Sequence, residues 1–296
     1  FIRLPNLILI AGFMWFVREF LVKPEFQTVN RQFSLSSFQF QLFILDVLLV
    51  AIIGYWLNDW FDRDIDKINK PNRFLVKNPL SRTKFWILIG SISIIATILS
   101  LYLAKITNHL NDLWILPVTL LSVGVYAIWL KRFKPIGNIL VSLLIVSLIA
   151  LVLVSENILN PLSCAIDAGF YLKSGLYASL IFVINMSREI VKDIEDLKGD
   201  QELSVVSIPS ILGVNKSKNL VITLLVFSML LELIYVWSDL STWIEIMAIG
   251  LLLLLHFSCI WMLKSSIKPN DFRQLSTLLK WLMSFGILQL AILSNW

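Results

Sequence analysis

Acidic residues are crowded at the end of one long apolar segment. The stretch GYWLNDWFDRDIDKINKPNRF, residues 54–74, carries Asn58, Asp62 and Asp66 at intervals of four positions. In an α-helix, residues at this spacing are displaced by only about 40° from one another around the axis, so the three side chains would share one face. Such a face could hold a cation, although a helix that leaves a membrane also becomes polar without any function.

A second acidic group follows another apolar segment later in the chain. In SREIVKDIEDLKGD, residues 187–200, Asp193, Asp196 and Asp200 stand at i, i+3 and i+7, again on one helical face. Gly199 is a candidate terminator of that helix, so the position of Asp200 depends on where the helix ends. One acidic helix end could be a simple cap, but two in corresponding positions favour a cation site divided between them.

The ligand types indicate which cation such a site would hold. Carboxylate and amide oxygens without His or Cys favour Mg²⁺, which keeps several waters and commonly binds carboxylates together with substrate phosphate oxygens. Basic residues that could neutralise a phosphate are interleaved with the acids: Lys70, Arg73, Lys131, Arg132, Arg188 and Lys192. Each of them also fits the positive-inside bias of membrane proteins. Metal, phosphate and apolar surroundings together suit an amphiphile with a hydrocarbon tail and a diphosphate head.

The elements that must position these residues are membrane-spanning helices. The sequence is 57% hydrophobic and only 15% charged, with a mean hydropathy of +0.80, which excludes an ordinary soluble domain. A spanning helix needs roughly 20 mostly apolar residues. The candidate spans are 4–22, 38–58, 84–104, 113–130, 136–154, 174–191, 219–237, 243–263 and 275–294. The first has no cleavage pattern after it, so we expect it to be retained. The predicted fold class is all-α: a polytopic membrane protein of nine transmembrane helices in a single domain, 1–296.

Charges in the connections predict the orientation of these helices. Lys and Arg concentrate in alternate connections, including the long ones at 59–83 and 192–218. Positive residues are retained on the cytoplasmic side, so the N-terminus and both acidic faces are expected there. The protein is thus predicted to be a multi-pass protein of the inner or cytoplasmic membrane with a cytoplasmic active site. Asp46 lies within the second span, away from both acidic groups, so we expect it to be structural.

The same stretches resemble the UbiA superfamily of intramembrane prenyltransferases. NDWFDRDID is similar to that family's NxxxDxxxD motif, and REIVKDIEDLKGD resembles its second aspartate-rich motif. YAIWLKRFKPIGN resembles its tyrosine and lysine segment, although Tyr126 and Lys131 are five positions apart rather than in the YxxxK spacing. The resemblance implies nine transmembrane helices that surround a central cavity, with both acidic motifs at its cytoplasmic end.

The resemblance also implies an Mg²⁺-dependent reaction. The second motif is most similar to that of digeranylgeranylglyceryl phosphate synthases, which alkylate a prenylated glycerol phosphate to make ether lipids. The following SVVSIPSILG departs from the threonine-leucine-proline pattern expected for them. The implied reaction transfers a polyprenyl group, with geranylgeranyl favoured, from polyprenyl diphosphate to prenylglyceryl phosphate.

The resemblance assigns roles to individual residues. The metal ligands would be Asn58, Asp62, Asp66, Asp193, Asp196 and Asp200, and Asp62, Asp66, Asp193 and Asp196 would be catalytic. Arg73, Lys131 and Lys192 are chosen to neutralise the diphosphate, which leaves Arg3, Arg132 and Arg188 for the phosphate of the acceptor.

Other functions stay open at this point. An aromatic acceptor, as in quinone biosynthesis, would need the same diphosphate chemistry, and so would an isoprenoid cyclase on the same fold. A cation transporter would place its acids near the midplane of the membrane rather than at cytoplasmic helix ends. A silent lipid-binding scaffold would not need both acidic faces. The expected partners are polyprenyl diphosphate, a lipid-like acceptor and membrane lipids, with no nucleic acid.

Overall fold

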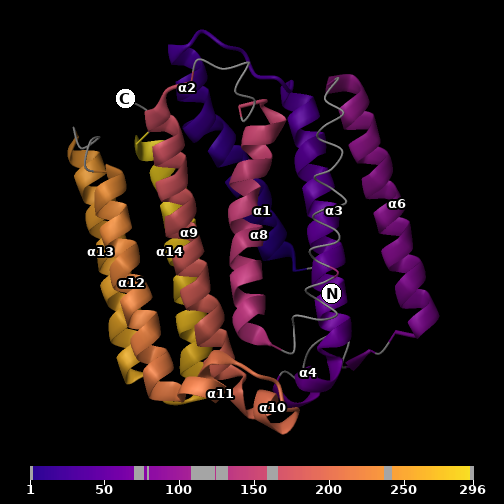
Figure 1. Cartoon of the computed structure of the whole chain (residues 1–296), viewed down its shortest axis with the longest axis vertical. Helices are drawn as coiled ribbons and strands as arrows, with labels where there is room; N and C mark the ends of the chain where they lie inside the picture. The colour runs from indigo at the N-terminus through magenta and orange to yellow at the C-terminus, as the bar shows by residue number, and fades with distance from the viewer. Residues whose placement is uncertain are drawn as a thin grey trace. The chain divides into compact units, whose positions relative to one another are not determined.

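The computed structural model describes residues 3–69, 77–78, 80–107, 124, 133–158, 166–236 and 242–293. This part of the chain is all-helical (Figure 1); it contains no β-strand, only an isolated bridge between Phe133 and Val206. Its helices are α1 (Leu4–Phe16), the π-helix η1 (Val17–Val22), α2 (Lys23–Thr28), α3 (Ser37–Phe61), α4 (Arg63–Asn69), α6 (Arg82–Thr107), α8 (Lys134–Ser155), α9 (Ala168–Glu195), α10 (Leu197–Glu202), α11 (Ile208–Leu212), α12 (Val214–Val236), α13 (Trp243–Ser265) and α14 (Pro269–Leu293).

The helices fall into two compact units. The first unit includes α3, α4 and α6, and is made of Phe1–Trp15, Gln32–Arg132 and Leu151–Cys164. The second includes most of α8 and all of α9 to α14, and is made of Phe16–Arg31, Phe133–Ala150 and Ala165–Trp296. The single domain expected for residues 1–296 stays a prediction.

Seven helical segments in the described part of the chain are long and apolar enough to cross a membrane. They are Leu4–Thr28, Ser37–Phe61, Arg82–Ile106, Lys134–Ser155, Val214–Tyr235, Trp243–Ser265 and Pro269–Ile292. Each segment contains most of one predicted span. Most of the helices extend beyond the apolar span into neighbouring polar residues. The protein is therefore an integral membrane protein.

The two other predicted spans differ in their outcome. Span 174–191 lies inside α9, but α9 is not among the seven segments, because Ser, Asn and charged residues interrupt its apolar run. Span 113–130 lies outside the described residues. The prediction of nine spanning helices is thus confirmed for seven of them.

Local signals explain where two of the spanning helices begin. Ser36 caps α3: its side chain accepts from the N–H of Gln39, while the Gln39 side chain accepts from the N–H of Ser36. Thr242 and Glu245 form the same reciprocal pair at the start of α13. This arrangement satisfies two backbone donors that the first turn of a helix leaves open.

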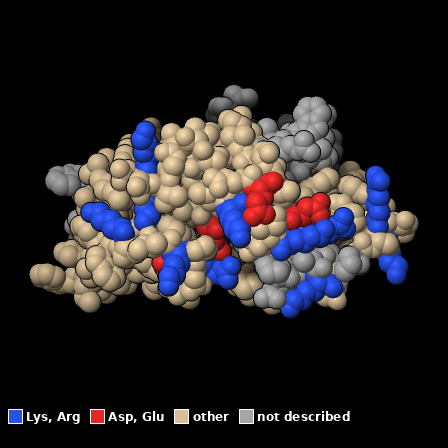
Figure 2. Space-filling view, turned by 90° about the horizontal axis from the view of Figure 1, so that it is seen from below, with Lys and Arg blue, Asp and Glu red and all other residues tan. Residues whose placement is uncertain are grey.

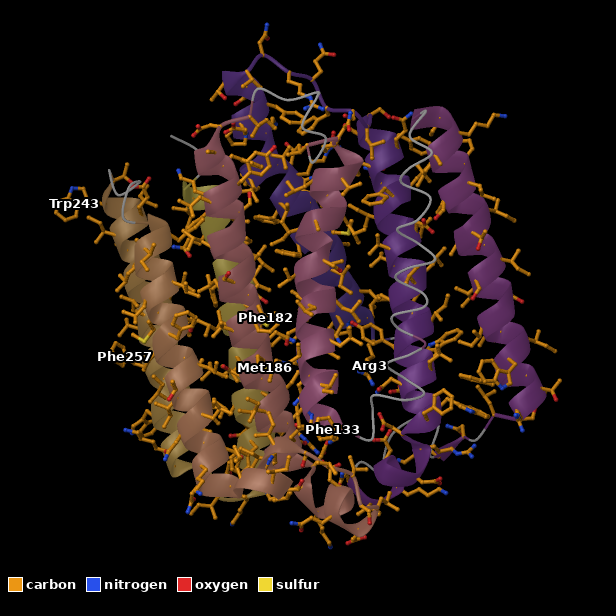
Figure 3. The ribbon with its side chains drawn as sticks, viewed as in Figure 1. Arg3, Phe133, Phe182, Met186, Trp243 and Phe257 are labelled. Atoms are coloured by element: carbon orange, nitrogen blue, oxygen red, sulfur yellow. The ribbon has the colours of Figure 1, made fainter. Side chains whose placement is uncertain are left out.

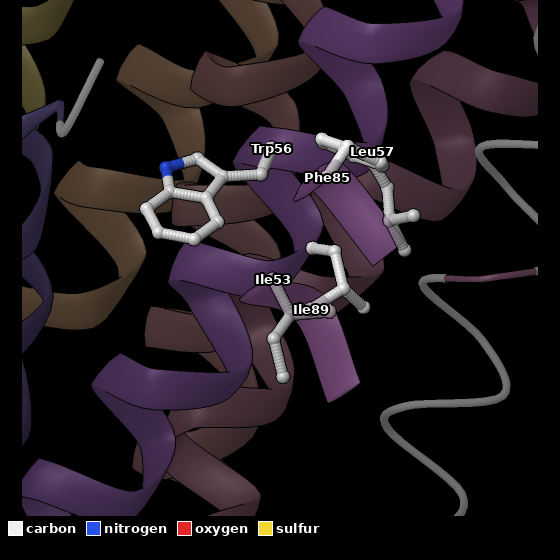
Figure 4. Close-up of a cluster of buried hydrophobic side chains, with 5 residues drawn as sticks. All are labelled: Ile53, Trp56, Leu57, Phe85 and Ile89. Atoms are coloured by element: carbon white, nitrogen blue, oxygen red, sulfur yellow. The ribbon is translucent and has the colours of Figure 1, made fainter. Parts of the chain in front are cut away.

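Helices α3 and α6 pack together in the first unit. Their contact near the C-terminal end of α3 is a cluster of buried side chains (Figure 4): Ile53, Trp56, Leu57, Phe85 and Ile89. Trp60 stacks on Phe85 with the ring centroids 4.1 Å apart. This packing fixes the end of α3, where the first acidic face begins.

A buried acid joins the same two helices at another level. Asp46 on α3 is 5% exposed and accepts a hydrogen bond from the hydroxyl of Ser100 on α6. An acid within a span is costly unless a partner satisfies it. The contact between two spanning helices agrees with the structural role expected for Asp46.

In the second unit, α9 packs against both α12 and α14. The hydroxyl of Tyr177 on α9 donates to the carbonyl of Gly286 on α14 at 3.4 Å, and its ring lies 6.0 Å from that of Tyr235 on α12. Ser228 on α12 and His256 on α13 approach to 2.8 Å between Oγ and Nε2. The helix that carries the second acidic group is therefore held by neighbours on two sides.

Apolar side chains are exposed along the outside of α13. Leu254, Phe257 and Trp261 are all well exposed, and Trp243 lies at the helix start (Figure 3). Trp is typical of the interface between membrane and water, whereas exposed apolar residues in mid-span contact lipid. The exposed side of α13 is therefore a lipid-facing surface.

Candidate active site

The first acidic face lies where α3 ends and α4 begins. Asp62 caps α3 and its N–H donates to the carbonyl of Asn58 at 2.9 Å, while the N–H of Asp66 donates to the carbonyl of Asp62 at 2.8 Å. These i to i−4 bonds carry the helical register across the break between α3 and α4. The three residues therefore follow one another on one side of the chain, as their spacing predicts. Asp66 is buried, and Asn58 and Asp62 are half-buried.

The neighbouring acids point to other partners. Asp59 forms an ion pair with Arg3, whose guanidinium also lies 5.0 Å from the ring centroid of Tyr55. Asp64 is exposed and pairs with Lys67 at 2.7 Å. Asp59 and Asp64 each have a basic partner within the protein, so neither needs a ligand to balance its charge. We therefore do not count them in the acidic face of Asn58.

In the second acidic group, a lysine that motif analysis did not select bridges two of the acids. Lys134 begins α8, and its Nζ lies 3.2 Å from Oδ1 of Asp193 and 2.7 Å from Oδ2 of Asp200. Asn138, one turn further along α8, donates from Nδ2 to Oδ2 of Asp193 at 2.7 Å. Both oxygens of Asp193 are thus oriented from α8, and Asp200 has no exposed surface.

The helix that carries this group ends earlier than Gly199 suggests. α9 ends at Glu195 because the backbone of Asp196 leaves helical values, with φ −91° and ψ 2°. The chain then turns helical again as α10, so Gly199 lies inside a helix and the prediction that it ends one is wrong. The N–H of Asp200 still donates to the carbonyl of Asp196, at 3.2 Å, which keeps Asp200 on the side of Asp193.

Burial and charge act in opposite directions on Asp193. Burial raises the pKa of this carboxyl to about 6, against the ammonium of Lys134 and the hydrogen bond from Asn138, which both lower it. Lys134 and Asn138 therefore favour the charged form of the carboxylate, which is the form that a metal ion binds, while burial disfavours it.

Two of the predicted phosphate-binding residues share a carboxylate that sequence analysis overlooked. Nη1 of Arg188 lies 3.1 Å and Nζ of Lys192 lies 2.5 Å from Oε1 of Glu189. Glu189 stands one turn before Asp193 on α9. A phosphate at this position would meet a basic pair that Glu189 already holds in place. The other predicted substrate-binding residues, Arg73, Lys131 and Arg132, and also Tyr126, lie outside the described residues.

Polar contacts between α8 and α9 continue away from the acids. Nδ2 of Asn185 donates to Oγ of Ser142 at 3.0 Å, and Ser142 donates to the carbonyl of Asn138 at 2.8 Å. Lys134, Asn138 and Ser142 stand at steps of four along α8, so one stripe of that helix faces the polar residues of α9. The stripe was visible in the sequence as three polar residues at one helical spacing within an apolar run.

The donor atoms of each acidic group suit a hard divalent cation. In the ranges that the structure describes, no three His, Cys, Asp or Glu side chains stand together as metal ligands would. Carboxylates and the Asn58 amide are nevertheless the ligands that Mg²⁺ prefers. Acidic side chains lie directly beside Lys and Arg side chains (Figure 2), which suits a charged phosphate ligand.

Sequence comparison decides the family. The sequence model of the UbiA prenyltransferase family matches residues 26–283, which include both acidic groups. The chain belongs to the UbiA prenyltransferase family. Members of the UbiA prenyltransferase family are generally metal-dependent, which agrees with the donor atoms of the two groups.

Several relatives carry the name digeranylgeranylglyceryl phosphate synthase. The Korarchaeum cryptofilum protein is 31% identical over 246 residues, which cover 81% of this UbiA-family chain and 80% of the relative. The Methanosphaera stadtmanae protein is 30% identical over 231 residues, or 77% and 75% of the two chains. The Pyrococcus horikoshii protein is 32% identical over 176 residues, or 60% of this chain, and the match spans only 57% of that relative.

Two solved structures share the fold. A UbiA homologue from Aeropyrum pernix superposes with a TM-score of 0.72 at 19% identity, over 97% of this chain and 98% of that one. A structure from a study of digeranylgeranylglyceryl phosphate synthase in membranes superposes with a TM-score of 0.68 at 23% identity, over 99% and 95%. At these identities the likeness shows the fold alone.

Proposed function

We propose that this chain is an Mg²⁺-dependent prenyltransferase that moves a polyprenyl group, with geranylgeranyl favoured, from its diphosphate to a prenylated glycerol phosphate in ether-lipid synthesis. The observation that carries the proposal is the environment of Asp193. It is a buried carboxylate, oriented through both oxygens, where a helix packed among apolar spans ends. A substrate with a hydrocarbon tail and a diphosphate head needs metal-binding carboxylates at such a position. The names of the relatives support the choice of acceptor.

The reaction has a simple balance of bonds. The bond between C1 of the prenyl group and the diphosphate oxygen breaks, and the diphosphate leaves with the electron pair. The hydroxyl oxygen of the acceptor forms the new C–O bond to C1 and releases its proton. Apolar walls of a central cavity among nine helices would keep water from the allylic cation.

Both acidic groups would contribute to the departure of the diphosphate. When bound, Mg²⁺ supplies positive charge against the negative charge that develops on the leaving group. Its proposed ligands are Asn58, Asp62, Asp66, Asp193 and Asp196, with Asp200 as the further residue that the spacing suggests. Arg73, Lys131 and Lys192 would neutralise the same diphosphate. The site would face the cytoplasm from the inner or cytoplasmic membrane, as the Lys and Arg bias indicates.

Product analysis tests the proposed function against its alternatives. Purified protein is incubated with Mg²⁺, polyprenyl diphosphates of several lengths, and either prenylglyceryl phosphate or aromatic acids, and the products are identified by mass spectrometry. We expect a diether phosphate from prenylglyceryl phosphate and no product from aromatic acids. A prenylated aromatic acid alone would favour the quinone-pathway alternative. A cyclic hydrocarbon formed without any acceptor would favour the cyclase.

Arg188 gives a prediction about the acceptor. An acceptor with its own phosphate needs a basic group apart from the diphosphate, and Arg suits phosphate through bidentate hydrogen bonds. Among the candidates, Arg132 lies outside the described residues, and Arg3 and Arg188 each pair with an acid, Asp59 and Glu189. We choose Arg188 because it lies on α9, the helix that carries Asp193. We expect Arg188→Ala to raise KM for prenylglyceryl phosphate about 10-fold, the loss of one hydrogen-bonded charge, and KM for the prenyl diphosphate much less.

The matched control is Arg273→Ala. Arg273 is exposed, and it pairs with Glu195 at 2.9 Å, so it offers the same change of charge near the end of α9. Its KM for either substrate should stay at the value of the unmodified chain. Equal increases in both KM values for Arg188→Ala would contradict a role in acceptor recognition.

A further inference from the structure

We propose that Lys280 on α14 is a further phosphate-binding residue, and that it holds the phosphate of the acceptor together with Arg188 on α9. Neither acidic motif contains Lys280, so the spacing of residues in the motifs could not select it. The inference rests on the proposed function and deepens it, because it assigns a second basic group to recognition of the acceptor.

The position of Lys280 within a membrane span is the first observation. It lies inside the spanning segment Pro269–Ile292 and is half-buried, so the excess of Lys and Arg in cytoplasmic connections does not explain it. A charged side chain in a span is costly unless it faces a polar partner, and such residues commonly mark the site of a substrate. Lys280 therefore needs polar surroundings inside the bundle of helices.

The packing of α9 against α14 sets the level of Lys280. The two helices lie side by side and run antiparallel (Figure 1), and Arg273 near the start of α14 pairs with Glu195 at the end of α9 at 2.9 Å. Two helical turns before Glu195 lies Arg188, and two turns after Arg273 lies Lys280. The positive charges of Arg188 and Lys280 are close enough to repel each other. The two helices thus bring two cations to the same level.

The surroundings of Arg188 favour an anion at this level. Glu189 offsets part of the positive charge, because its Oε1 lies 3.1 Å from Nη1 of Arg188, and Lys280 adds a second positive charge from the facing helix. The Nε of Arg188 is buried and has no hydrogen-bond partner within the part of the chain that the structure describes. A buried donor is costly to leave without an acceptor. An anionic oxygen between the two helices would satisfy Nε and hold the two cations together.

A phosphate monoester fits these donors. It carries a charge of about −2 at neutral pH and three acceptor oxygens, which suit the fork of an arginine beside a compact ammonium. The diphosphate of the donor has the same chemistry, but its proposed metal ligand Asp193 lies more than one helical turn further along α9 than Arg188. The level of Arg188 and Lys280 therefore favours the phosphate of the acceptor.

Ligand binding to the full chain in detergent tests the inference. The variants are Lys280→Met, which removes the charge, and Lys280→Arg, which keeps it. Lys264→Met is the matched control, since Lys264 is exposed on the neighbouring α13. Equilibrium dialysis gives Kd for three probes: prenylglyceryl phosphate, the same prenylglycerol without its phosphate, and prenyl diphosphate with Mg²⁺.

The expected loss is specific to the phosphate of the acceptor. Lys280→Met should raise Kd for prenylglyceryl phosphate about 10-fold, as on loss of one charge-assisted hydrogen bond, and leave Kd for the other two probes nearly unchanged. Lys280→Arg should restore most of the affinity. Lys264→Met should bind all three probes as the unmodified chain does.

Thermal unfolding separates a binding role from a structural one. Met is apolar and similar in length to Lys, so Tm of Lys280→Met should not fall, because the variant removes a costly charge from a span. A fall in Tm with an unchanged Kd for prenylglyceryl phosphate would show that Lys280 only links α9 to α14, and would overturn the inference.

A second result would also overturn it. If Kd for prenyl diphosphate rises as much as Kd for prenylglyceryl phosphate, Lys280 belongs to the diphosphate site. The proposed function can fail separately: if the probes bind in the expected pattern but no diether phosphate forms, the inference stands without it. Conversely, diether phosphate formed by a chain in which Lys280→Met leaves every Kd unchanged would support the function and refute the role of Lys280.

Discussion

Asp62→Asn should nearly abolish prenyl transfer, whereas Asp64→Asn should leave it close to the rate of the unmodified chain. The two acids are two positions apart, but Asp62 follows Asn58 and precedes Asp66 on the first acidic face, while Asp64 is exposed and pairs with Lys67. Asn keeps the shape of the side chain and removes the charge that a metal ion needs. We expect kcat to fall about 10²- to 10³-fold for Asp62→Asn, as on removal of one transition-state charge contact.

Steady-state kinetics with saturating substrates, together with Tm, separate this effect from unfolding. Asp66→Asn should behave as Asp62→Asn does, because both lie on the same face. Asp46→Asn should lower Tm and leave kcat largely intact, since its contact is with Ser100 between two spans. If Asp62→Asn and Asp64→Asn had the same rate, the helical face would not be the metal site.

Periodicity made the first acidic face predictable. The i to i−4 bonds that link Asn58, Asp62 and Asp66 are local, so the four-residue spacing in the sequence translates directly into position. The spanning helices were predictable for a related reason, because an apolar segment of about 20 residues in a membrane has to satisfy its own backbone. Both features depend on residues that are close in the sequence, so they can be predicted without knowledge of distant contacts.

The partners of the second group could not be predicted in this way. Asn138 lies 55 positions from Asp193, and Lys134 lies 66 positions from Asp200, so only the packing of α8 beside α9 brings them together. Read alone, a lysine at the start of a span marks the cytoplasmic interface and nothing more. The early end of α9 was missed for a different reason. Gly follows the end of many helices, but here the backbone of Asp196 departs from the helix first.

The basic residues of the second motif were assigned to phosphate binding without regard to the acid beside them. Arg188 and Lys192 flank Glu189 closely enough to share Oε1, a contact that one turn of helix permits. A basic residue in a phosphate-binding motif is easily assigned to the ligand, but a carboxylate in the same turn competes for it. The consequence is that phosphate binding at Arg188 has to be measured against the pair that it already forms.

Removal of divalent metal with excess EDTA should abolish prenyl transfer and leave the chain folded. Loss of activity follows from the carboxylates of the two groups, which without the metal cannot offset the charge on the departing diphosphate. Many small metal-dependent domains unfold without their ion because metal binding supplies much of their folding free energy. In this chain the Lys134 ammonium already lies between Asp193 and Asp200, and Asn138 satisfies the other oxygen of Asp193.

Activity and Tm should therefore respond differently to the removal of metal. In EDTA the rate should fall to background and return on addition of Mg²⁺ or Mn²⁺, while Tm measured in parallel should change little. Undiminished turnover in excess EDTA would rule out the metal-dependent mechanism. A large fall in Tm with EDTA would show instead that the metal is part of the fold, and that Lys134 does not compensate the buried acids. The Lys134→Met variant should show that second behaviour, because its buried carboxylates lose the counter-charge of the ammonium and a bound ion would then replace it.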